Sequence, residues 1–444
     1  MGQGENSREL ILDTLLLIDR DGEYSHIALK QVLDKYQYLD KKERAFITRV
    51  VNGTLERMIE LDHIIHSFSK VKVNKMKPVI RMILRSGVYQ IKYMDAVPDS
   101  AVCNEAVKLA GKRGFTGLKG FVNGVLRNVS RNLAKVEYPS REKDPEGYLS
   151  IRYSLPAWLA AQWILEYGLE KAEEIGEGFF AERPLCVRCN TSRISREELA
   201  ERLRREGVEA TPDEEVPCAL WLQGYDHVAG LPEFREGLFY VQDLSSMRAV
   251  LWADPKEGDQ VLDVCAAPGG KSFSAAFAME DQGEIWACDL HENKLKRIRE
   301  GAERLGLACI QTTAADGRVF RPEWEAAFDV VLVDAPCSGF GIIRKKPDVR
   351  YKKPDDLFAL PVIQRAILDN AARYVRPGGT LVYSTCTILP EENEGVSDSF
   401  LAEHPDFAAR PSPCPDRWGD RGPGDSVPHR HGTDGFYICR MTRN

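Results

Sequence analysis

The sequence predicts a multidomain protein, with an all-α domain, a small α+β domain and an α/β domain in this order. Apolar residues at helical spacing from residue 8 to about residue 134 predict the first, and short strand-like runs around one amphipathic helix predict the second. Strand-like runs that alternate with helical stretches from about residue 258 onward predict the third. The 444 residues, 43% of them apolar, can bury about two or three cores. We place the domains at residues 1–135, 150–237 and 238–444.

The all-α domain concentrates positive charge, although the whole chain is acidic. The net charge is −7, from 60 Lys and Arg against 67 Asp and Glu, yet residues 1–135 hold 23 basic and 15 acidic side chains. Within residues 70–135 the count is 14 basic against 3 acidic. This asymmetry favours a polyanionic partner for the first domain, with a solvated helix face as the alternative interpretation.

The helices of the first domain are predicted by apolar residues at steps of three and four, as in Ile47, Val51 and Leu55. Several such helices make a bundle, and a bundle places the basic residues between its apolar positions on the outer surface, where phosphates can be met. The candidates on the last helices are Lys108, Lys112, Arg113, Lys119, Arg127 and Arg131.

A polar stretch with two prolines and alternating charges, residues 137–147, is predicted to be a linker. In the small domain that follows, residues 185–189 alternate like a strand, and a capping box at Ser195 predicts the start of an amphipathic helix. Residues 217–222 and 238–241 are further strand candidates. The pattern of this domain alone does not indicate a function.

Cysteine and histidine usage favours a reducing compartment and no metal. The 11 cysteines follow a polar start rather than an apolar signal segment, and Cys186 with Cys189 forms a lone C-x-x-C without a second pair of ligands. His429 and His431 fall in a loop rich in Pro and Gly and are expected to be solvated. No apolar run approaches the roughly 20 residues of a membrane span. We therefore expect a soluble, cytoplasmic protein without a metal.

The α/β domain is predicted by four strand-like runs, residues 261–264, 285–288, 330–333 and 380–383, and by the helix-like segments 271–280, 291–305 and 361–375. The alternation predicts a parallel, doubly wound sheet. Such a sheet binds ligands at the carboxyl ends of its strands. The polar residues of interest all follow predicted strand ends.

The first strand runs into DVCAAPGGKS at residues 263–272, a glycine-rich loop that opens a helix and lets a ligand approach the backbone. The loop matches neither the dinucleotide nor the P-loop pattern. Asp289, 26 residues after Asp263, ends the second strand, where a carboxylate can accept both hydroxyls of an adenosine ribose. Asp316, after a third strand, is a candidate to face the adenine amino group. A structural turn residue is the alternative interpretation of Asp289.

Two cysteines follow neighbouring strands, Cys337 in DAPCSG at residues 334–339 and Cys386 in STCT at residues 384–387. A cysteine that only packs in the core would lie within a strand rather than past its end. Two thiols beside one cleft therefore predict nucleophilic chemistry.

These strings are jointly similar to motifs of the RNA cytosine-5 methyltransferases, which use S-adenosylmethionine. The similar strings are CAAPGGKS at 265–272, DAPCSG at 334–339, YSTCT at 383–387, FYVQDLSS at 239–246 and DGFY at 434–437. In the first domain, ERAF at 43–46 and VPDSAV at 97–102 resemble the helical RNA-binding domain of the NusB type. The combination is typical of the bacterial RsmB (Sun/Fmu) subfamily, and the resemblance covers essentially the whole chain.

The resemblance implies a NusB-like helical domain, a small α+β domain that binds RNA or links its neighbours, and a Rossmann-like methyltransferase domain. It implies methylation of C5 of one cytosine in small-subunit (16S) ribosomal RNA, either naked or in an assembling subunit, by a protein that we expect to be a monomer. The residues that it implies for S-adenosylmethionine binding are Cys265, Ala266, Ala267, Pro268, Gly269, Gly270, Lys271, Asp289, Asp316 and Asp334.

The chemistry explains why such an enzyme needs a thiol. C5 of cytosine is too poor a nucleophile to attack a methyl sulfonium, so a thiolate must first add to C6. Only about 3% of a free cysteine is thiolate at pH 7, so nearby positive charge is expected, and Lys271 is a candidate for it. Asp334 can protonate or hydrogen-bond N3 of the ring, or it can contact the cofactor.

The chemistry does not decide which thiol attacks. By analogy with the Pro-Cys motif of DNA cytosine methyltransferases it would be Cys337. The RNA family implies the opposite, with Cys386 as the nucleophile and Cys337 assisting elimination, and the residues that flank both cysteines match that family.

The loop after the Pro-Cys turn, residues 342–353, is expected to bind the phosphate backbone of the RNA substrate. A solvated turn is the alternative interpretation. Its cations are Arg344, Lys345, Lys346, Arg350, Lys352 and Lys353. Two rival functions remain: a non-catalytic RNA-binding factor, which the intact cysteines and glycine loop disfavour, and a methyltransferase of another RNA such as transfer RNA.

Overall fold

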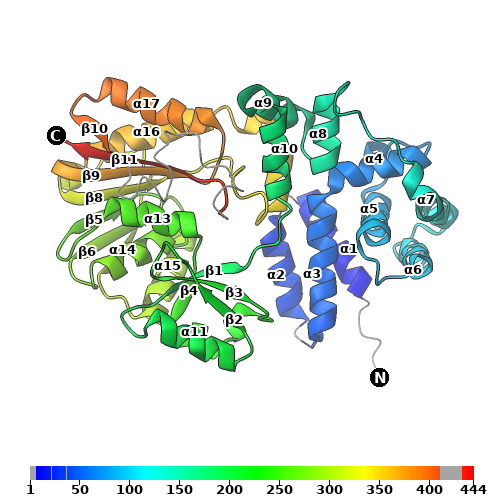
Figure 1. Cartoon of the computed structure of the whole chain (residues 1–444), viewed down its shortest axis with the longest axis horizontal. Coiled ribbons are helices and arrows are strands. Elements are labelled where there is room, and N and C mark those ends of the chain that lie inside the picture. The colour runs from blue at the N-terminus through cyan, green and yellow to red at the C-terminus, as the bar shows by residue number, and fades with distance from the viewer. Residues whose placement is uncertain (1–6, 22, 37, 411–432) are drawn as a thin grey trace. The chain divides into compact units, whose positions relative to one another are not determined.

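The structure is a computed structural model that describes residues 7–21, 23–36, 38–410 and 433–444 (Figure 1). His429 and His431 lie outside these ranges. The chain forms two compact units. One, the helical unit, is Met1–Phe180 with Ile343–Lys352, and the other, the catalytic unit, is Ala181–Ile342 with Lys353–Asn444.

The helical unit confirms the predicted all-α domain. Its core contains the apolar repeat Ile47, Val51 and Leu55, packed against α1, α5 and their neighbours. Asp40 caps α3 by accepting a hydrogen bond from the Glu43 backbone N–H at 2.8 Å. The helices are α1 Ser7–Asp21, α2 Ser25–Lys35, α3 Lys41–Glu56, α4 Met58–Phe68, α5 Pro78–Tyr93, α6 Asp99–Lys112, α7 Lys119–Asn132, α8 Pro145–Tyr153, α9 Ala157–Tyr167 and α10 Leu169–Gly178.

The predicted linker ends earlier than expected. Residues 145–147 already form the first turn of α8, because Pro145 suits that position and the Asp144 carboxylate accepts a hydrogen bond from the Gly147 N–H at 2.9 Å. The segment before them has no regular helix or strand after the short 3₁₀ turn Leu133–Lys135.

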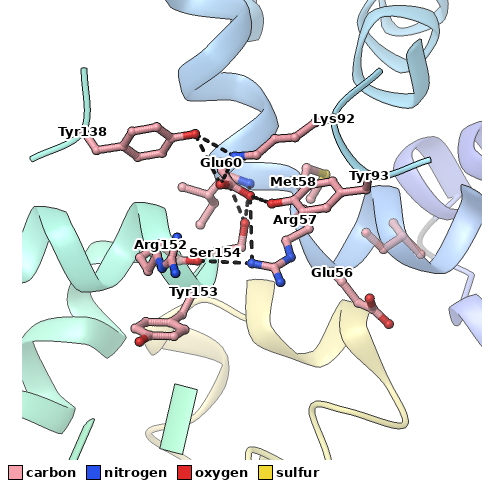
Figure 2. Close-up of polar contacts among 12 residues, drawn as sticks. Glu56, Arg57, Met58, Glu60, Lys92, Tyr93, Tyr138, Arg152, Tyr153 and Ser154 are labelled. Atoms are coloured by element: carbon pink, nitrogen blue, oxygen red, sulfur yellow. Dashed lines mark hydrogen bonds and ion pairs between the residues drawn. The ribbon is translucent and has the colours of Figure 1, made fainter. Parts of the chain in front are cut away.

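A buried polar cluster joins α4 to α5 and to the residue after α8 (Figure 2). The Glu60 side chain is 1% exposed, lies 2.5 Å from Lys92 Nζ, and accepts a hydrogen bond from Tyr93 Oη. Ser154, in the left-handed conformation with φ of 54°, accepts from the Ile59 and Glu60 N–H groups at 3.1 Å each. A hydroxyl from another segment thus caps the first turn of α4.

Arg350, which we expected to face RNA, is instead fully buried in the helical unit, so this part of the prediction is wrong. Its Nη1 donates to the carbonyls of Glu56 at 2.6 Å and Tyr153 at 3.1 Å, and its guanidinium lies 5.1 Å from the Phe180 ring centroid. The adjacent Tyr351 Oη accepts from the Met58 N–H at 3.2 Å. Free carbonyls at the ends of α3 and α8 accept hydrogen bonds from this guanidinium. A count of charges along the sequence cannot reveal that the arginine is buried.

The part of the small α+β domain from Ala181 onward forms the first part of the catalytic unit, whereas residues 150–180, which we also placed in this domain, belong to the helical unit. Its antiparallel sheet has the order β2-β3-β1-β4. The Ser195 hydroxyl accepts from the Glu198 N–H at 3.2 Å and caps α11, as predicted. Cys186 and Cys189 are both buried strand residues of β1, as expected. The elements are β1 Leu185–Cys189, α11 Arg196–Arg205, β2 Glu209–Pro212, β3 Ala219–Gln223, α12 Pro232–Arg235 and β4 Phe239–Val241.

The α/β domain contains a seven-stranded sheet with the order β10-β11-β9-β8-β5-β6-β7. The pairs among β5 to β9 are parallel, as predicted, whereas β11 pairs antiparallel with both β9 and β10. The strands are β5 Gln260–Asp263, β6 Glu284–Asp289, β7 Ile310–Ala314, β8 Phe328–Asp334, β9 Val375–Thr385, β10 Phe407–Arg410 and β11 Tyr437–Arg443.

Helices cover both faces of this sheet (Figure 1). On one face Val261 and Val330 pack with α14 and α15, and on the other Leu262 and Val331 pack with α16 and α17. The helices are α13 Leu244–Ala253, α14 Gly270–Ala278, α15 Glu292–Leu305, α16 Leu360–Ala372 and α17 Glu394–Glu403. Within the described ranges, no helix combines the length and apolar character that crossing a membrane requires.

Candidate active site

The sheet order places the site at the carboxyl ends of the parallel strands. The strand β5 lies between β8 and β6, and the chain order reverses direction at this point. Ligands bind at such a switch point in open α/β sheets. The glycine loop after β5, Asp289 after β6, Asp334 at the end of β8 and Cys386 after β9 therefore share one edge of the sheet.

The glycine loop is a tight turn that leads directly into α14. The Ala266 N–H donates to the Cys288 carbonyl at 2.7 Å, which ties the loop to β6, and the Gly269 N–H donates to the Ala266 carbonyl at 2.6 Å. Gly269 has a φ of +107°, and a Cβ there would lie 2.6 Å from the Phe273 ring. Only glycine fits this position.

Residues of the FYVQDLSS segment hold the glycine loop in place through hydrogen bonds. Gln242 Nε2 donates to the Gly270 carbonyl at 2.8 Å, and the Gln242 Oε1 accepts from Tyr240 Oη at 2.9 Å and Ser274 Oγ at 2.8 Å. Burial raises the pKa of Tyr240, so its hydroxyl stays a donor. The sequence marked this segment as family-like without showing what it does.

Asp289 keeps one carboxylate oxygen unused. Its Oδ1 accepts from the His291 N–H at 3.0 Å and lies 3.3 Å from Lys294 Nζ, while its Oδ2 has no hydrogen-bond partner among the described residues. Asp316 differs, because Arg318 occupies both of its oxygens, with Nε at 2.9 Å and Nη2 at 2.7 Å. These hydrogen bonds lower the pKa of Asp316.

Lys271 and Asp334 form an ion pair at the end of the glycine loop, in which the lysine is buried and the Asp334 side chain is 36% exposed. Lys271 Nζ lies 2.7 Å from Asp334 Oδ2, and the lysine side chain is 6% exposed. Ser384 Oγ donates to Asp334 Oδ1 at 3.0 Å, and the Phe436 ring centroid lies 5.0 Å from the same ammonium. The sequence named Lys271 as a source of positive charge for a thiol, and the structure pairs that charge with Asp334.

The two predicted thiols are in direct contact. Cys337 Sγ and Cys386 Sγ lie 3.3 Å apart, and the Cys386 N–H donates to Cys337 Sγ at 3.4 Å. Both are free cysteines and half-buried. The hydrogen bond with Cys386 and burial raise the pKa of Cys337 well above its ordinary value. Cys337 is therefore held in the thiol form beside the Cys386 sulfur.

A buried carboxylate that the sequence reasoning missed holds the Pro-Cys turn. Glu392 is 2% exposed, and its Oε2 accepts from the Ser338 N–H and from Gln364 Nε2, both at 2.8 Å. Gln364 Nε2 also donates to the Pro336 carbonyl at 2.9 Å. The two residues therefore fix the turn on both sides of Cys337. The available signal was the cluster of acidic residues shortly after the Thr-Cys motif.

The Thr-Cys turn is held from the other side. Ser338 Oγ and Thr387 Oγ1 lie 2.7 Å apart and link the two cysteine turns, and the Gly341 N–H donates to the Cys386 carbonyl at 3.0 Å. The Gly435 N–H in turn donates to the Gly341 carbonyl at 2.9 Å. A Cβ on Gly341 would lie 1.9 Å from the Gly435 carbonyl oxygen, so the DGFY segment requires glycine there.

The predicted RNA-binding residues belong to the helical unit, whereas the two thiols belong to the catalytic unit. Lys112 Nζ is paired with Glu9 at 2.6 Å, Arg113 with Asp13 at 2.7 Å, and Arg127 Nε donates to Asn123 at 2.9 Å. Lys119 is half-buried and Arg131 is exposed. Arg344, Lys345 and Lys346 belong to the segment Ile343–Lys352 of the same unit, and of these Lys345 is exposed.

Comparison with known families gives matches along most of the chain. Residues 250–442 match the model of the 16S rRNA methyltransferase RsmB/F family, and residues 5–131 match that of the NusB family. Residues 155–229 match the ferredoxin-like domain of RsmF/B-like methyltransferases. These matches confirm the predicted fold class: a NusB-like helical domain, a small α+β domain of ferredoxin-like type and a methyltransferase domain.

Curated relatives and solved structures agree with the family models. The probable ribosomal RNA small subunit methyltransferase B of Bacillus subtilis is 40% identical, over 98% of both chains. The ribosomal RNA small subunit methyltransferase B of Pectobacterium carotovorum is 32% identical over 93% of this chain and 96% of its own. The crystal structure of PH0851 superposes with a TM-score of 0.83 and 28% identity, covering 99% of this chain and all of that one.

Proposed function

The chain belongs to the 16S rRNA methyltransferase RsmB/F family, and from this premise we propose that it transfers a methyl group from S-adenosylmethionine to C5 of one cytosine in small-subunit ribosomal RNA. The observation that carries the proposal is the contact of two thiols, 3.3 Å apart, at the carboxyl ends of adjacent strands. A methyltransferase that acts on a nucleophilic oxygen or nitrogen has no use for such a pair, whereas C5 of a pyrimidine requires a thiolate.

We assign the roles of the two cysteines as the resemblance to the RNA cytosine-5 methyltransferases implies, with Cys386 as the nucleophile and Cys337 assisting elimination. The raised pKa of Cys337 keeps it in the thiol form and lets it donate a hydrogen bond to the Cys386 sulfur. The Cys386 thiolate adds to C6 of the cytosine, forming an S–C6 bond while the electron pair moves toward N3 and makes C5 nucleophilic. After C5 has been methylated, a base removes the C5 proton and the S–C6 bond breaks, which returns Cys386 as a thiolate.

The ion pair of Lys271 and Asp334 serves the pyrimidine ring. Asp334 ends β8 and its hydrogen-bond donor Ser384 lies on β9, the two strands after which Cys337 and Cys386 follow, and this placement suits hydrogen bonding to the N3 edge of the base. As charge builds at N3 during addition, a preorganised donor stabilises it. The Lys271 ammonium supplies this hydrogen-bond donor, and Asp334 holds the ammonium in position.

The chain has the features that an S-adenosylmethionine site requires. The loop Cys265, Ala266, Ala267, Pro268, Gly269, Gly270 and Lys271 lets the cofactor approach the backbone, and the unused Oδ2 of Asp289 suits a ribose hydroxyl. Asp316 lies beyond β7 and is the candidate for the adenine edge. When bound, the cofactor supplies an activated methyl group on a sulfonium.

A non-catalytic RNA-binding factor is the alternative function. It does not explain why Glu392, Gln364 and Thr387 hold both cysteine turns in one arrangement. A second alternative, another RNA as substrate, is separated from the proposal by the experiment below.

The test is incubation of the full chain with labelled S-adenosylmethionine and either unmodified small-subunit ribosomal RNA or transfer RNA, followed by mapping of 5-methylcytosine by mass spectrometry. We expect one modified cytosine in the ribosomal RNA and none in transfer RNA. Label on transfer RNA, or at a position other than C5, contradicts the proposal.

A further inference from the structure

The connection between α4 and α5 carries four lysines within eight residues. We define the lysine loop as residues 70–77, which read KVKVNKMK. Lys70, Lys72, Lys75 and Lys77 are all exposed, and none of them forms an ion pair or side-chain hydrogen bond with the described part of the chain. We propose that the lysine loop is a contact surface for RNA phosphates, an inference that rests on the proposed function and specifies where its substrate is held.

Most other cations of this basic region already have partners. Arg81 pairs with Asp19 at 2.6 Å, Arg85 with Asp62 at 2.6 Å, and Lys108 with Glu105 at 2.7 Å. Figure 2 shows Lys92 held by the buried Glu60 and by Tyr138. These cations have their charge balanced within the helical unit. An RNA phosphate that bound them would compete with a carboxylate, and the lysine loop presents no such competitor.

The other cations of residues 70–135 without a described ion pair are more dispersed. Lys119, Arg127, Arg131 and Lys135 are spread over α7 and the turn after it. Arg127 Nε donates to Asn123, and Lys119 packs its stem beside Gly111. The four lysines of the loop, by contrast, are close enough along the backbone to meet successive phosphates of one strand. Charge density, rather than charge alone, therefore distinguishes the lysine loop.

The backbone of the lysine loop is fixed, so its lysines are presented from a defined surface. Val73 and Met76 are each 7% exposed and anchor the loop in the helical core. The Lys75 N–H donates to the Lys72 carbonyl at 2.9 Å, and the Val71 N–H donates to Ser69 Oγ at 3.0 Å. A preorganised backbone lowers the entropy that binding must overcome, so only side-chain freedom is lost when RNA is bound.

The arrangement is unfavourable in the absence of an anion. Four like charges repel one another, and Lys77 directly precedes the first turn of α5, which carries no acidic residue. A positive charge at a helix N-terminus opposes the helix dipole. Bound phosphate relieves both effects, which is the expected behaviour of a surface built for a polyanion rather than for solvent.

The test is the salt dependence of RNA binding by the full chain, measured without S-adenosylmethionine on unmodified small-subunit ribosomal RNA. The variant carries Lys70→Gln, Lys72→Gln, Lys75→Gln and Lys77→Gln. Each phosphate contact contributes about 0.7 to the slope of log K against log salt, so we expect the slope to fall by about 2.8, and the loss of affinity from about 0.05 to 0.2 M salt to shrink about 50-fold.

The matched control removes four exposed, ion-paired cations of the catalytic unit, with Arg202→Gln, Arg205→Gln, Lys296→Gln and Arg299→Gln. It changes the net charge equally and should leave the slope within about 0.7 of that of the unaltered protein. A control that lowers the slope as much as the loop variant, or a loop variant that keeps the original slope, overturns the proposal.

A second variant with arginine at all four loop positions keeps the charge and should keep the slope. Thermal unfolding of each variant shows whether it is folded, and the loop variant should unfold no earlier than the unaltered protein because charge repulsion is removed. The modified base is identified in a separate assay. Loss of the slope together with methylation at an unexpected atom would leave the lysine loop in place and refute only the proposed function.

Discussion

The sulfur atoms of Cys337 and Cys386 lie 3.3 Å apart, although 49 residues separate them in the chain. The contact arises because β8 and β9 are adjacent parallel strands, with Asp334 opposite Ser384 at their carboxyl ends. Each cysteine lies a few residues past that pair. The pairing of strands thus creates a proton-sharing dithiol without a disulfide.

Replacement of Cys386 by alanine should abolish methyl transfer. The substitution removes the atom that bonds to C6, so we expect the single-turnover rate with labelled S-adenosylmethionine to fall by more than about 1,000-fold. Cys439→Ala, at a half-buried cysteine on β11, is the control and should retain activity. Normal turnover by the Cys386→Ala protein would reverse the roles of the two thiols.

Replacement of Cys337 by alanine should leave the attack intact and impair release. Without the neighbouring thiol the S–C6 bond is formed but not efficiently broken, so protein covalently bound to RNA should accumulate. Denaturing gel electrophoresis after incubation with substrate detects this species, and mapping of the cross-linked peptide should identify residue 386. If the Cys337→Ala protein turns over freely and no adduct forms, Cys337 has no role in elimination.

Glu392→Gln should slow methyl transfer by about 10-fold, because the hydrogen bond from the Ser338 N–H to a charged acceptor is worth about 1.5–3 kcal/mol and positions the Cys337 turn. The measurement is the single-turnover rate together with thermal unfolding. The adjacent exposed Glu391→Gln serves as the control. Equal rates in both variants would show that the Glu392 charge does not position the turn.

The stability of the catalytic unit should decrease as pH rises from about 4 to about 7. Burial raises the pKa of Asp263 from 3.8 to about 7, with Asp334 adding to the rise and Lys271 and Ser272 opposing it. Since the folded protein holds the proton more tightly than the unfolded chain, the stabilisation is complete below pH 4 and lost on approaching pH 7. The rise corresponds to about 4 kcal/mol.

The check is chemical denaturation of Asp263→Asn beside the unaltered protein at pH 5 and pH 8. The amide remains neutral, so the variant should gain stability relative to the unaltered protein as pH rises. A constant difference between the two proteins across this range would contradict the raised pKa.

Arg350→Met should destabilise the helical unit by about 3 kcal/mol, because the carbonyls of Glu56 and Tyr153 lose a charged donor. Hydrogen exchange at the amides of residues 55–60 reports the effect locally. Lys353→Met, at an exposed lysine close by in the chain, is the control. Unchanged protection in the Arg350→Met protein would show that the guanidinium does not hold the α3–α4 junction.

Much of the fold and the core of the site could be predicted from the sequence, because both depend on local pattern. Alternation of apolar runs gave the parallel strands, and strand ends located Cys337, Cys386 and Asp289. The antiparallel β10 and β11 were missed because no alternation of strand and helix accompanies them. Contacts between distant side chains were also missed: Glu392 meets Ser338 across 54 residues, and Lys112 meets Glu9 across 103.

Charge patterns were the least reliable guide, since they carry no information on burial. Arg350 and Lys345 look alike in the sequence, yet one is buried against backbone carbonyls and the other is exposed. The predicted domain boundaries, the monomeric state and the RNA-facing residues stay predictions.

The assignment of Ile343–Lys352 to the helical unit determines the order in which the protein can mature on the ribosome. The N-terminal helices emerge first, but the carbonyls of Glu56 and Tyr153 have no Arg350 donor until that residue is synthesised, after β5 to β8. A fragment that ends at Phe180 therefore lacks a piece of its own interior. The nascent helices reach their final stability only when translation has passed the Pro-Cys turn.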